Sequence, residues 1–402
     1  MNILIADKLS EGALENLRAM GAAITYNPGL TADDLPDVVD DNEILVVRST
    51  RVTASTIKAG KNLQLIIRAG AGYNTIDLDA AGERGVFVSN CPAKNTHAVA
   101  ELVIGLMIAM DRRIVDAATD LRKGVWNKKE YSKADGLAGR TLGIIGLGAI
   151  GKAVARSAKG LGMQVIAWSR RFTEELAEEW DIGYCTTPRD LAEKADVITI
   201  HLAATPETTN FCDAEFFSHV KERAIFINTS RGNIVDAAAL KKAMTQKQIR
   251  VALDVYENEP ASGDKVFPDS DLAKAIVGTP HIGASTTQAA EAIADAVVDI
   301  VKAYENTGKP LNVVNVRKDS CECTTLIVTH VNKVGVLASV LTDIRQDDIN
   351  IEEMENIIFA NGKAATAMIQ LDEEPSGDLL QRIKSHPEVM HISKKHHGEP
   401  GG

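Results

Sequence analysis

A glycine-rich segment, placed well inside the chain, constrains the fold more than any other feature. The sequence G146-L-G-A-I-G151 directly follows an apolar run, T141-L-G-I-I145, and precedes a stretch of helical character, K152-A-V-A-R-S-A-K-G-L161. A strand, a tight glycine turn and a helix in this order let the backbone approach a pyrophosphate, which the free amides at the helix start can bind. A glycine turn that serves only α/β packing is the alternative. The context favours dinucleotide binding by Gly146, Gly148, Ala149, Ile150 and Gly151.

Short apolar runs alternate with amphipathic stretches on both sides of this loop. One series starts at N2-I-L-I-A6 and fills the first 95 residues, and a second runs from L142-G-I-I145 to V251-A-L-D254. Such alternation predicts parallel sheets covered by helices, in two doubly wound, Rossmann-like α/β domains. Because the glycine loop comes so late, and a helix is expected after the last strand, we expect the second domain to be inserted in the first. The expected parts are a split substrate-binding domain (1–96 and 284–315) and a dinucleotide-binding domain (97–283).

The last 80 residues predict a third, smaller unit. Strands and helices alternate there in the order βαββαβ, which is the ferredoxin-like α+β arrangement. We expect this unit to span 324–395, after a polar linker over 316–323 and before a disordered tail over 396–402. The pair C321-E-C323 has no second Cys/His pair to complete a metal site, so a coincidence within the linker is better supported than metal or redox chemistry.

The composition limits the possible partners of the chain. The formal net charge of −11 argues against non-specific binding to nucleic acid, and it also repels anionic substrates. A phosphate or carboxylate site must therefore be built from locally placed Arg and Lys. No apolar run approaches the roughly 20 residues of a membrane span, and the first residues lack the basic region of an export signal. With five cysteines, an odd number, we expect a cytoplasmic protein with no nucleic-acid or membrane partner and no metal.

Three polar residues behind the glycine loop can supply the chemistry. Arg231 lies in N228-T-S-R-G232, Glu259 in the run D-V-Y-E-N-E-P that starts at Asp254, and His281 in T279-P-H-I-G-A-S285. An imidazole titrates near neutral pH, so His281 can take a hydroxyl proton as hydride leaves the neighbouring carbon. Glu259 can bond the other ring nitrogen, and Arg231 can bind a carboxylate. Each residue alone also suits a purely structural role, but the three together favour an oxidoreductase.

These motifs resemble those of the D-isomer-specific 2-hydroxyacid dehydrogenases. The resemblance covers nearly all of residues 1–315 and implies a nucleotide-binding domain that splits the substrate domain. It also implies that Arg231, Glu259 and His281 are catalytic. Further residues match positions that line the nicotinamide side of the cofactor: Thr229, Ser230, Asp254, Gly283 and Ala284.

The preference of the family for NAD cannot be assigned to this chain from the resemblance alone. Most members have an acidic residue after the second strand of the nucleotide-binding domain, where it binds the ribose 2′-hydroxyl of NAD. Here Ser169, Arg170 and Arg171 follow V165-I-A-W168. A serine with two arginines leaves space and positive charge for the extra phosphate of NADP, unless the arginines merely cap the strand at the surface. NAD is the expected cofactor, with NADP as the open alternative.

Within the family, the chain looks like the members that oxidise D-3-phosphoglycerate to 3-phosphohydroxypyruvate, the first step of serine biosynthesis. L45-V-V-R-S-T-R-V-T53, I67-R-A-G-A-G-Y-N74 and C91-P-A-K-N-T96 match segments that bind this phosphorylated hydroxy acid. The resemblance implies these substrate ligands: Arg48, Arg68, Ala71, Gly72, Asn95 and, from a neighbouring subunit, Lys128. A solvated surface position is the alternative for Lys128. A glyoxylate or hydroxypyruvate reductase is the nearest alternative function, and a non-catalytic dinucleotide sensor is another.

The C-terminal unit resembles the ACT regulatory domain. H330-V-N-K-V-G-V-L337 and I349-N-I351 match segments that bind serine between two subunits, which implies His330, Asn332 and Asn350 as effector ligands. Val334 replaces a proline that is common in this turn. The alternative is a domain that serves only to oligomerise. Feedback inhibition by L-serine and a homodimer or homotetramer are therefore expected.

Overall fold

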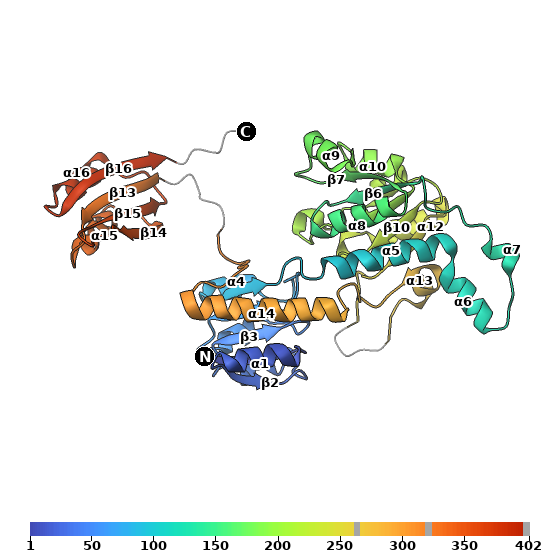
Figure 1. The fold of residues 1–402 in the computed structure, drawn as a ribbon, viewed down its shortest axis with the longest axis horizontal. Helices are drawn as coiled ribbons and strands as arrows, with labels where there is room; N and C mark the ends of the chain where they lie inside the picture. The colour runs from blue at the N-terminus through green and yellow to red at the C-terminus, as the bar shows by residue number, and fades with distance from the viewer. Residues whose placement is uncertain (261–265, 318–323, 397–402) are drawn as a thin grey trace. The chain divides into compact units, whose positions relative to one another are not determined.

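The computed structural model describes residues 1–260, 266–317 and 324–396 of the chain. The chain forms two compact units, Met1–Asn315 and Val316–Gly402 (Figure 1). No helix of the described residues is both long and apolar enough to span a membrane. Cys321 and Cys323, the possible metal or redox pair, lie outside the described residues.

The first sheet of the larger unit is parallel and has the strand order β2-β1-β3-β4-β5. Its strands are β1 (Asn2–Ile5), β2 (Ala23–Tyr26), β3 (Ile44–Val47), β4 (Leu65–Arg68) and β5 (Phe87–Asn90). The central strands are continuous apolar runs because helices cover both of their faces. One face packs against α1 (Glu11–Ala19) and the late helix α14 (Thr287–Thr307). The other packs against α2 (Leu35–Val38), α3 (Ala54–Ala59) and α4 (Leu78–Glu83).

The second sheet is also parallel and has the order β12-β11-β10-β9-β6-β7-β8. Its strands are β6 (Thr141–Ile145), β7 (Gln164–Trp168), β8 (Gly183–Tyr184), β9 (Val197–Ile200), β10 (Ile225–Asn228), β11 (Arg250–Leu253) and β12 (Val277–Gly278). Because α14 returns to the first sheet after this second sheet is complete, the expected insertion of one α/β domain in the other is confirmed (Figure 1).

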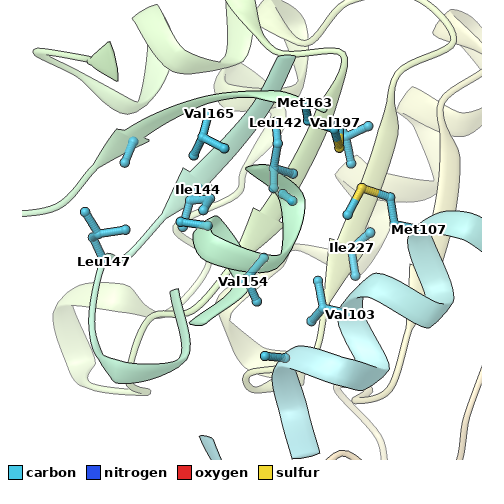
Figure 2. Packing of buried hydrophobic residues seen from close by; sticks show 14 of the residues in the cluster. Val103, Met107, Leu142, Ile144, Leu147, Val154, Met163, Val165, Val197 and Ile227 are labelled. Carbon is cyan, nitrogen blue, oxygen red and sulfur yellow. The ribbon is translucent and has the colours of Figure 1, made fainter. Parts of the chain in front are cut away.

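Helices cover both faces of the second sheet. On one face, α5 (Thr96–Arg112) and α8 (Ala149–Gly160) bring Val103, Met107 and Val154 onto the strands, as Figure 2 shows. Helices α10 (Pro188–Lys194), α11 (Ala214–His219) and α12 (Ala237–Lys247) cover the other face, and α9 (Glu174–Trp180) and α13 (Ser270–Ala275) complete the domain. Strands β7 and β8 are added on one side of β6, whereas β9 to β12 are added on its other side. Ligands of such sheets bind where the side of addition switches, beyond the carboxyl ends of β6 and β9.

Two short helices, α6 (Ile114–Arg122) and α7 (Lys128–Tyr131), form an arm that contains no buried residue. Polar contacts hold the arm together instead of a core. Arg113 pairs with Glu130 at 2.6 Å, and the Tyr131 hydroxyl donates to Asp120 at 2.6 Å. The apolar side chains of the arm point into solvent, and Trp126 is 79% exposed.

The smaller unit is a four-stranded antiparallel sheet with the order β14-β15-β13-β16. The elements follow as β13 (Thr324–Val331), α15 (Val336–Gln346), β14 (Ile351–Ile358), β15 (Ala364–Leu371), α16 (Gly377–Ser385) and β16 (Val389–His396). The expected ferredoxin-like fold is thereby confirmed. Residue 396 was expected to begin a disordered tail, but His396 pairs with Thr324 of β13 and belongs to the sheet. Residues 397–402 lie outside the described residues.

Candidate active site

The histidine and glutamate singled out by the sequence form a direct pair. His281 Nδ1 lies 2.8 Å from Glu259 Oε2, and Glu259 Oε1 accepts the backbone N–H of Tyr256 at 3.1 Å. Burial opposes ionisation of Glu259, but the hydrogen bond and charge of His281, the Tyr256 N–H and the charge of Arg231 together outweigh burial and lower the pKa of this carboxyl below its usual value. An ionised Glu259 on Nδ1 fixes the ring orientation and leaves Nε2 free to accept a proton. A cavity of about 630 Å³ opens beside the pair, between Tyr256, Phe267 and Pro280.

Asp254 shapes the loop that carries His281. This residue is only 1% exposed, and its Oδ1 accepts the Thr279 hydroxyl at 2.6 Å and the Ile282 N–H at 2.8 Å. Its Oδ2 accepts the Gly283 N–H at 2.8 Å. These bonds enclose His281, whose φ of +52° is uncommon for a residue with a side chain. The Asp254 carboxylate therefore stabilises the loop of residues 279–283. Its expected contact with the cofactor stays a prediction.

The loop after β10 carries Arg231, and hydrogen bonds with the Asn228 side chain fix its shape. Asn228, the last residue of β10, is 1% exposed; its Oδ1 accepts the Ser230 N–H at 2.9 Å, and its Nδ2 donates to the Arg231 carbonyl at 2.9 Å. Gly232 lies so close to the Tyr256–Glu257 peptide that a β-carbon there would overlap it. A glycine is required because the Arg231 loop and the Glu259 loop approach each other backbone to backbone.

Arg231 belongs to a cluster with Arg48 and Arg68. Arg48 directly follows β3, and Arg68 ends β4, so the first sheet presents both at its carboxyl edge. Burial lowers the pKa of Arg68 to about 10, and the positive charges of Arg231 and Arg48 contribute to this shift. Burial likewise lowers the pKa of Arg231, against the favourable charge of Glu259.

This arginine cluster has unused bonding capacity. In the described part of the chain none of the three guanidinium groups forms an ion pair, and Arg68 Nε is buried without a hydrogen-bond partner. Grouped cations without a carboxylate partner form a site that an anion can complete. Ala71 and Gly72, two expected substrate ligands, lie in the loop beside it, and the Ala71 carbonyl accepts the Asn90 side chain at 2.6 Å.

The glycine loop has the features that a dinucleotide needs. Helix α8 begins after Gly148 with no side chain capping its amides, whereas Ser10, Asp77 and Thr286 cap their own helices. A β-carbon at Gly146 would come 2.6 Å from the His201 carbonyl, and one at Gly151 would overlap the Gly146 carbonyl. A β-carbon at Gly148 would meet no atom within 4 Å, so the space beside this residue is open.

Two buried polar atoms along the expected path of the cofactor and substrate have no partner. They are Thr229 Oγ1, after β10, and Asn95 Oδ1, at the uncapped start of α5. Buried polar groups without partners commonly mark a site for a ligand or water. Together with Ser230, Gly283, Ala284 and the amides of Ala149, Ile150 and Gly151, they fit a nicotinamide dinucleotide. The described residues contain no cluster of His, Cys, Asp or Glu that could hold a metal ion.

Ser169 and Arg170 follow β7, the neighbour of β6 in the sheet. Arg170 is exposed, and its positive charge contributes to a lowered pKa of Glu207, after the hydrogen bond that Glu207 accepts from Thr205. Neither Ser169 nor Arg170, the residues that follow β7, is acidic. The charged groups here include both a cation, Arg170, and an anion, Glu207.

The remaining sequence candidates lie on the exposed arm and in the smaller unit. Lys128 begins α7 on the exposed arm, and its expected role in a neighbouring subunit stays a prediction. In the smaller unit His330 is 2% exposed, with Nδ1 bonded to the Val331 carbonyl at 2.8 Å and Nε2 3.4 Å from Asn356 Oδ1.

The effector candidates Asn332 and Asn350 do not meet within one chain. Asn332 follows the end of β13 that pairs Val331 with Ala364, whereas Asn350 precedes the end of β14 that pairs Ile351 with Leu371. These are opposite ends of the sheet, on the order of 20 Å apart. A site that uses both residues therefore needs a second copy of the chain.

Sequence reasoning missed two residues that organise the site. Asn228 stands three residues before Arg231 in the same motif, and its side chain holds the Arg231 loop. Asp7 follows β1, and its Oδ2 accepts the N–H groups of Arg48, Ser49 and Thr50. A polar residue at the carboxyl end of a buried parallel strand was the available signal for both.

Comparison with known proteins identifies the family. Residues 104–283 match the model of the D-isomer specific 2-hydroxyacid dehydrogenase, NAD binding domain. The chain is 37% identical over 317 residues to D-3-phosphoglycerate dehydrogenase of Methanocaldococcus jannaschii, covering 78% of this chain but only 59% of that protein. It is 38% identical over 298 residues to hydroxypyruvate reductase of Thermotoga maritima, covering 73% of this chain and 95% of that protein.

A solved structure agrees. NAD⁺-bound 3-phosphoglycerate dehydrogenase of Entamoeba histolytica superposes with a TM-score of 0.66 at 27% identity, covering 79% of this chain and 99% of that one. The fold, the paired His281 and Glu259 and the sequence matches agree with one another. The chain belongs to the D-isomer specific 2-hydroxyacid dehydrogenase family.

Proposed function

We propose that this chain oxidises D-3-phosphoglycerate to 3-phosphohydroxypyruvate with a nicotinamide cofactor. The observation that carries the proposal is the cluster of Arg48, Arg68 and Arg231, which forms no ion pair with any described carboxylate and shares the site with His281. D-3-phosphoglycerate carries a phosphate at one end and a carboxylate at the other. Three cations suit both groups, whereas a small hydroxy acid with a single carboxylate needs fewer.

The residues of this chain move the proton. His281 accepts the 2-hydroxyl proton of the substrate at Nε2, because Nδ1 is engaged by Glu259. The negative charge of Glu259 stabilises the imidazolium that results. Arg231 binds the substrate carboxylate and holds C2 in place, and it polarises the carbonyl oxygen in the reverse reaction. The bound nicotinamide supplies the acceptor for the hydride that leaves C2.

Arg48 and Arg68 bind the phosphate group of the substrate. Both stand at the carboxyl edge of the first sheet, whereas Arg231 and His281 come from the second. One end of the substrate is thus bound by each α/β domain. The relatives named D-3-phosphoglycerate dehydrogenase support this assignment, although the chain spans 59% of the length of the M. jannaschii protein.

A second function, reduction of hydroxypyruvate, has two observations in its favour. The 38% identity to a hydroxypyruvate reductase extends over nearly the whole of that protein. Ser169 and Arg170 also suit NADP, which would favour the reducing direction. The paired His281 and Glu259 leave little reason for a non-catalytic sensor, because a sensor needs no base.

The cofactor preference belongs to the same proposal. We infer NAD as the cofactor, in keeping with the matched NAD-binding domain and the NAD⁺-bound structural relative. Ser169 lacks the carboxylate that selects the ribose hydroxyl, so discrimination against NADP is expected to be weak.

The exposed arm supports a homo-oligomer. Its apolar side chains, Ile114, Val115, Leu121 and Trp126, are each about half exposed or more, although polar contacts fix the arm in shape. Several exposed apolar side chains on a preformed element suit contact with a second copy. Lys128 lies on the same arm and would then reach the neighbouring site.

The smaller unit is proposed to regulate the enzyme as an ACT-like domain that binds L-serine. Its support is the ferredoxin-like topology and the edge strand β14, whose residues are nearly all exposed. Pairing two copies along β14 would bring Asn350 of one copy to the opposite end of the other, where Asn332 lies.

Initial rates with D-3-phosphoglycerate test the whole proposal, using NAD and NADP in parallel, with and without L-serine. Turnover that falls with serine supports substrate and regulation together. Turnover unaffected by serine removes the regulatory part. No turnover, with rapid reduction of hydroxypyruvate by NADPH, replaces the proposal by the reductase.

A further inference from the structure

A single carboxylate oxygen organises the loop that carries Arg48. Asp7 Oδ2 accepts the backbone N–H groups of Arg48 at 2.7 Å, Ser49 at 3.0 Å and Thr50 at 3.0 Å. Three successive amides directed at one oxygen fix the backbone of all three residues. The direction in which the Arg48 side chain leaves the chain is fixed with them.

The sheet places Asp7 at this point. Strand β1 pairs with β3 in parallel, with Ile5 opposite Val46, and the Ala6 N–H donates to the Val46 carbonyl at 3.0 Å. Both strands therefore end at the same edge, with Asp7 beside the residues that follow β3. A small rotation of the loop would turn Arg48 away from Arg68, its neighbour at the end of β4.

The three amides are not available to a substrate, because Asp7 already engages them. An anion that binds at this edge must therefore use the arginine side chains, and their positions decide its affinity. Arg48, Arg68 and Arg231 repel one another, so the cluster tends to disperse unless its backbone is held. The negative charge of Asp7 also acts on Arg68 and offsets part of this repulsion.

We propose that Asp7 is a positioning residue that holds Arg48 in the phosphate-binding arrangement and so sets the preference for a phosphorylated over an unphosphorylated substrate. This inference rests on the proposed function, in which Arg48 and Arg68 bind the phosphate. Asp7 itself touches no reacting atom. Its effect on catalysis is exerted through the loop.

Charge and geometry predict opposite changes in the KM of the variant Asp7→Asn for the phosphorylated substrate. Removing one negative charge makes the site more positive, so Coulomb attraction alone would bind the anionic substrate more tightly and lower its KM. Replacing a charged acceptor by a neutral one weakens all three amide bonds, frees the loop and raises KM. The sign of the change therefore separates the two effects.

The experiment compares the parent enzyme, Asp7→Asn and a control, Asp33→Asn, in the reduction of 3-phosphohydroxypyruvate and hydroxypyruvate. Asp33 is exposed in the same domain, and its variant loses the same charge. For Asp7→Asn we expect KM for the phosphorylated substrate to rise about tenfold or more, with kcat and the KM for the cofactor within about twofold. KM for hydroxypyruvate should change little, and the control should match the parent.

Hydrogen exchange of the amides of residues 48–50 supplies a readout that does not depend on turnover. In Asp7→Asn this exchange should accelerate, while exchange in β6 and α8 stays unchanged. The proposal is overturned if these amides exchange at the parent rate, if KM for the phosphorylated substrate falls, or if both substrates lose kcat equally. A parent enzyme that ignores phosphorylated substrates would refute the proposed function instead, while the exchange result would still decide whether Asp7 holds the loop.

Discussion

The guanidinium group of Arg231 lies against Gly72, so closely that a β-carbon at residue 72 would overlap its Nη2 atom. Arg231 follows β10 in the second sheet, and Gly72 follows β4 in the first. The same loop accommodates Arg68, whose Nη1 would overlap a β-carbon at Gly70. Two glycines thus make room for two guanidinium groups, and this brings cations from both sheets into one site.

Gly72→Ala is expected to displace Arg231 and lower kcat/KM for the phosphorylated substrate by about 10- to 100-fold, because small misplacements of a substrate ligand are costly. Steady-state rates measure the loss. The matched control is Gly82→Ala, in helix α4, where a β-carbon meets no atom within 4 Å. This control should keep full activity and gain up to about 1 kcal/mol of stability. Equal activity of both variants would contradict the assigned contact.

Glu259→Gln is expected to lower kcat on the order of 10²- to 10⁴-fold, because a neutral amide neither fixes the His281 ring nor stabilises its charged form. Rates at saturating substrate test this expectation. A variant that retains parent kcat would show that the bond between the two side chains has no part in the reaction.

The same variant has a pH signature in stability. The pKa of Glu259 is lowered in the folded chain from its usual 4.5, so its ionised form stabilises the fold at neutral pH. This contribution is fully present above pH 4.5 and is lost as the pH falls through the folded pKa. The difference in thermal midpoint between parent and Glu259→Gln should therefore be largest near pH 7 and shrink below pH 4.5. A gap that widens in acid would contradict the sign of the shift.

Asp254→Asn is expected to destabilise the chain by about 1–3 kcal/mol, because the amide cannot accept all three bonds from the 279–283 loop and is buried. Since His281 sits within this loop, kcat should fall as well. Denaturant unfolding gives the first quantity and steady-state kinetics the second. A destabilised variant with unchanged kcat would show that the bonds of Asp254 to this loop are not needed for catalysis.

Ser169→Asp is expected to raise the ratio of kcat/KM for NAD over NADP by about tenfold or more, since the new carboxylate bonds the ribose hydroxyl and repels a 2′-phosphate. The ratio is measured with one substrate at fixed concentration. An unchanged ratio would place the end of β7 away from the cofactor ribose.

In the proposed homo-oligomer, Trp126→Lys is expected to shift the population toward smaller species, because it places a charge among the exposed apolar side chains of the arm. Sedimentation velocity over a concentration series shows the shift. Leu161→Lys, an exposed apolar position outside the arm, is the control and should leave the assembly unchanged.

The parts of the fold that follow from local sequence were predictable. Strand, glycine turn and helix around Gly146 carry their own signal, and so do the apolar runs that form β1, β3 to β7 and β9 to β11. The short strands β2 and β8 are not apolar runs and were not predicted. The candidate catalytic residues Arg231, Glu259 and His281 could be singled out because each lies in a recognisable motif. Their mutual contacts, however, depend on pairing between distant strands, which a single sequence does not encode locally.

The missed residues illustrate this limit. The place of Asp7 at the end of a buried strand was a signal in the sequence, but its bonds to residues 48–50 were not predictable, because the parallel pairing of β1 with β3 creates them. Gly72 was expected as a substrate ligand, but its close approach to Arg231 requires both sheets to be in place. Asn332 and Asn350 lie only 18 residues apart in sequence, yet they occupy opposite ends of a sheet. Nearness along the chain did not imply nearness in space.

The most direct test of the central claim is the ratio of kcat/KM for 3-phosphohydroxypyruvate to that for hydroxypyruvate, measured with NADH and NADPH. If Arg48 and Arg68 bind a phosphate, the ratio should be on the order of 10² or more with the preferred cofactor, because the analogue leaves both cations unpaired. A ratio of one or less would contradict the account and assign the chain to the reductases.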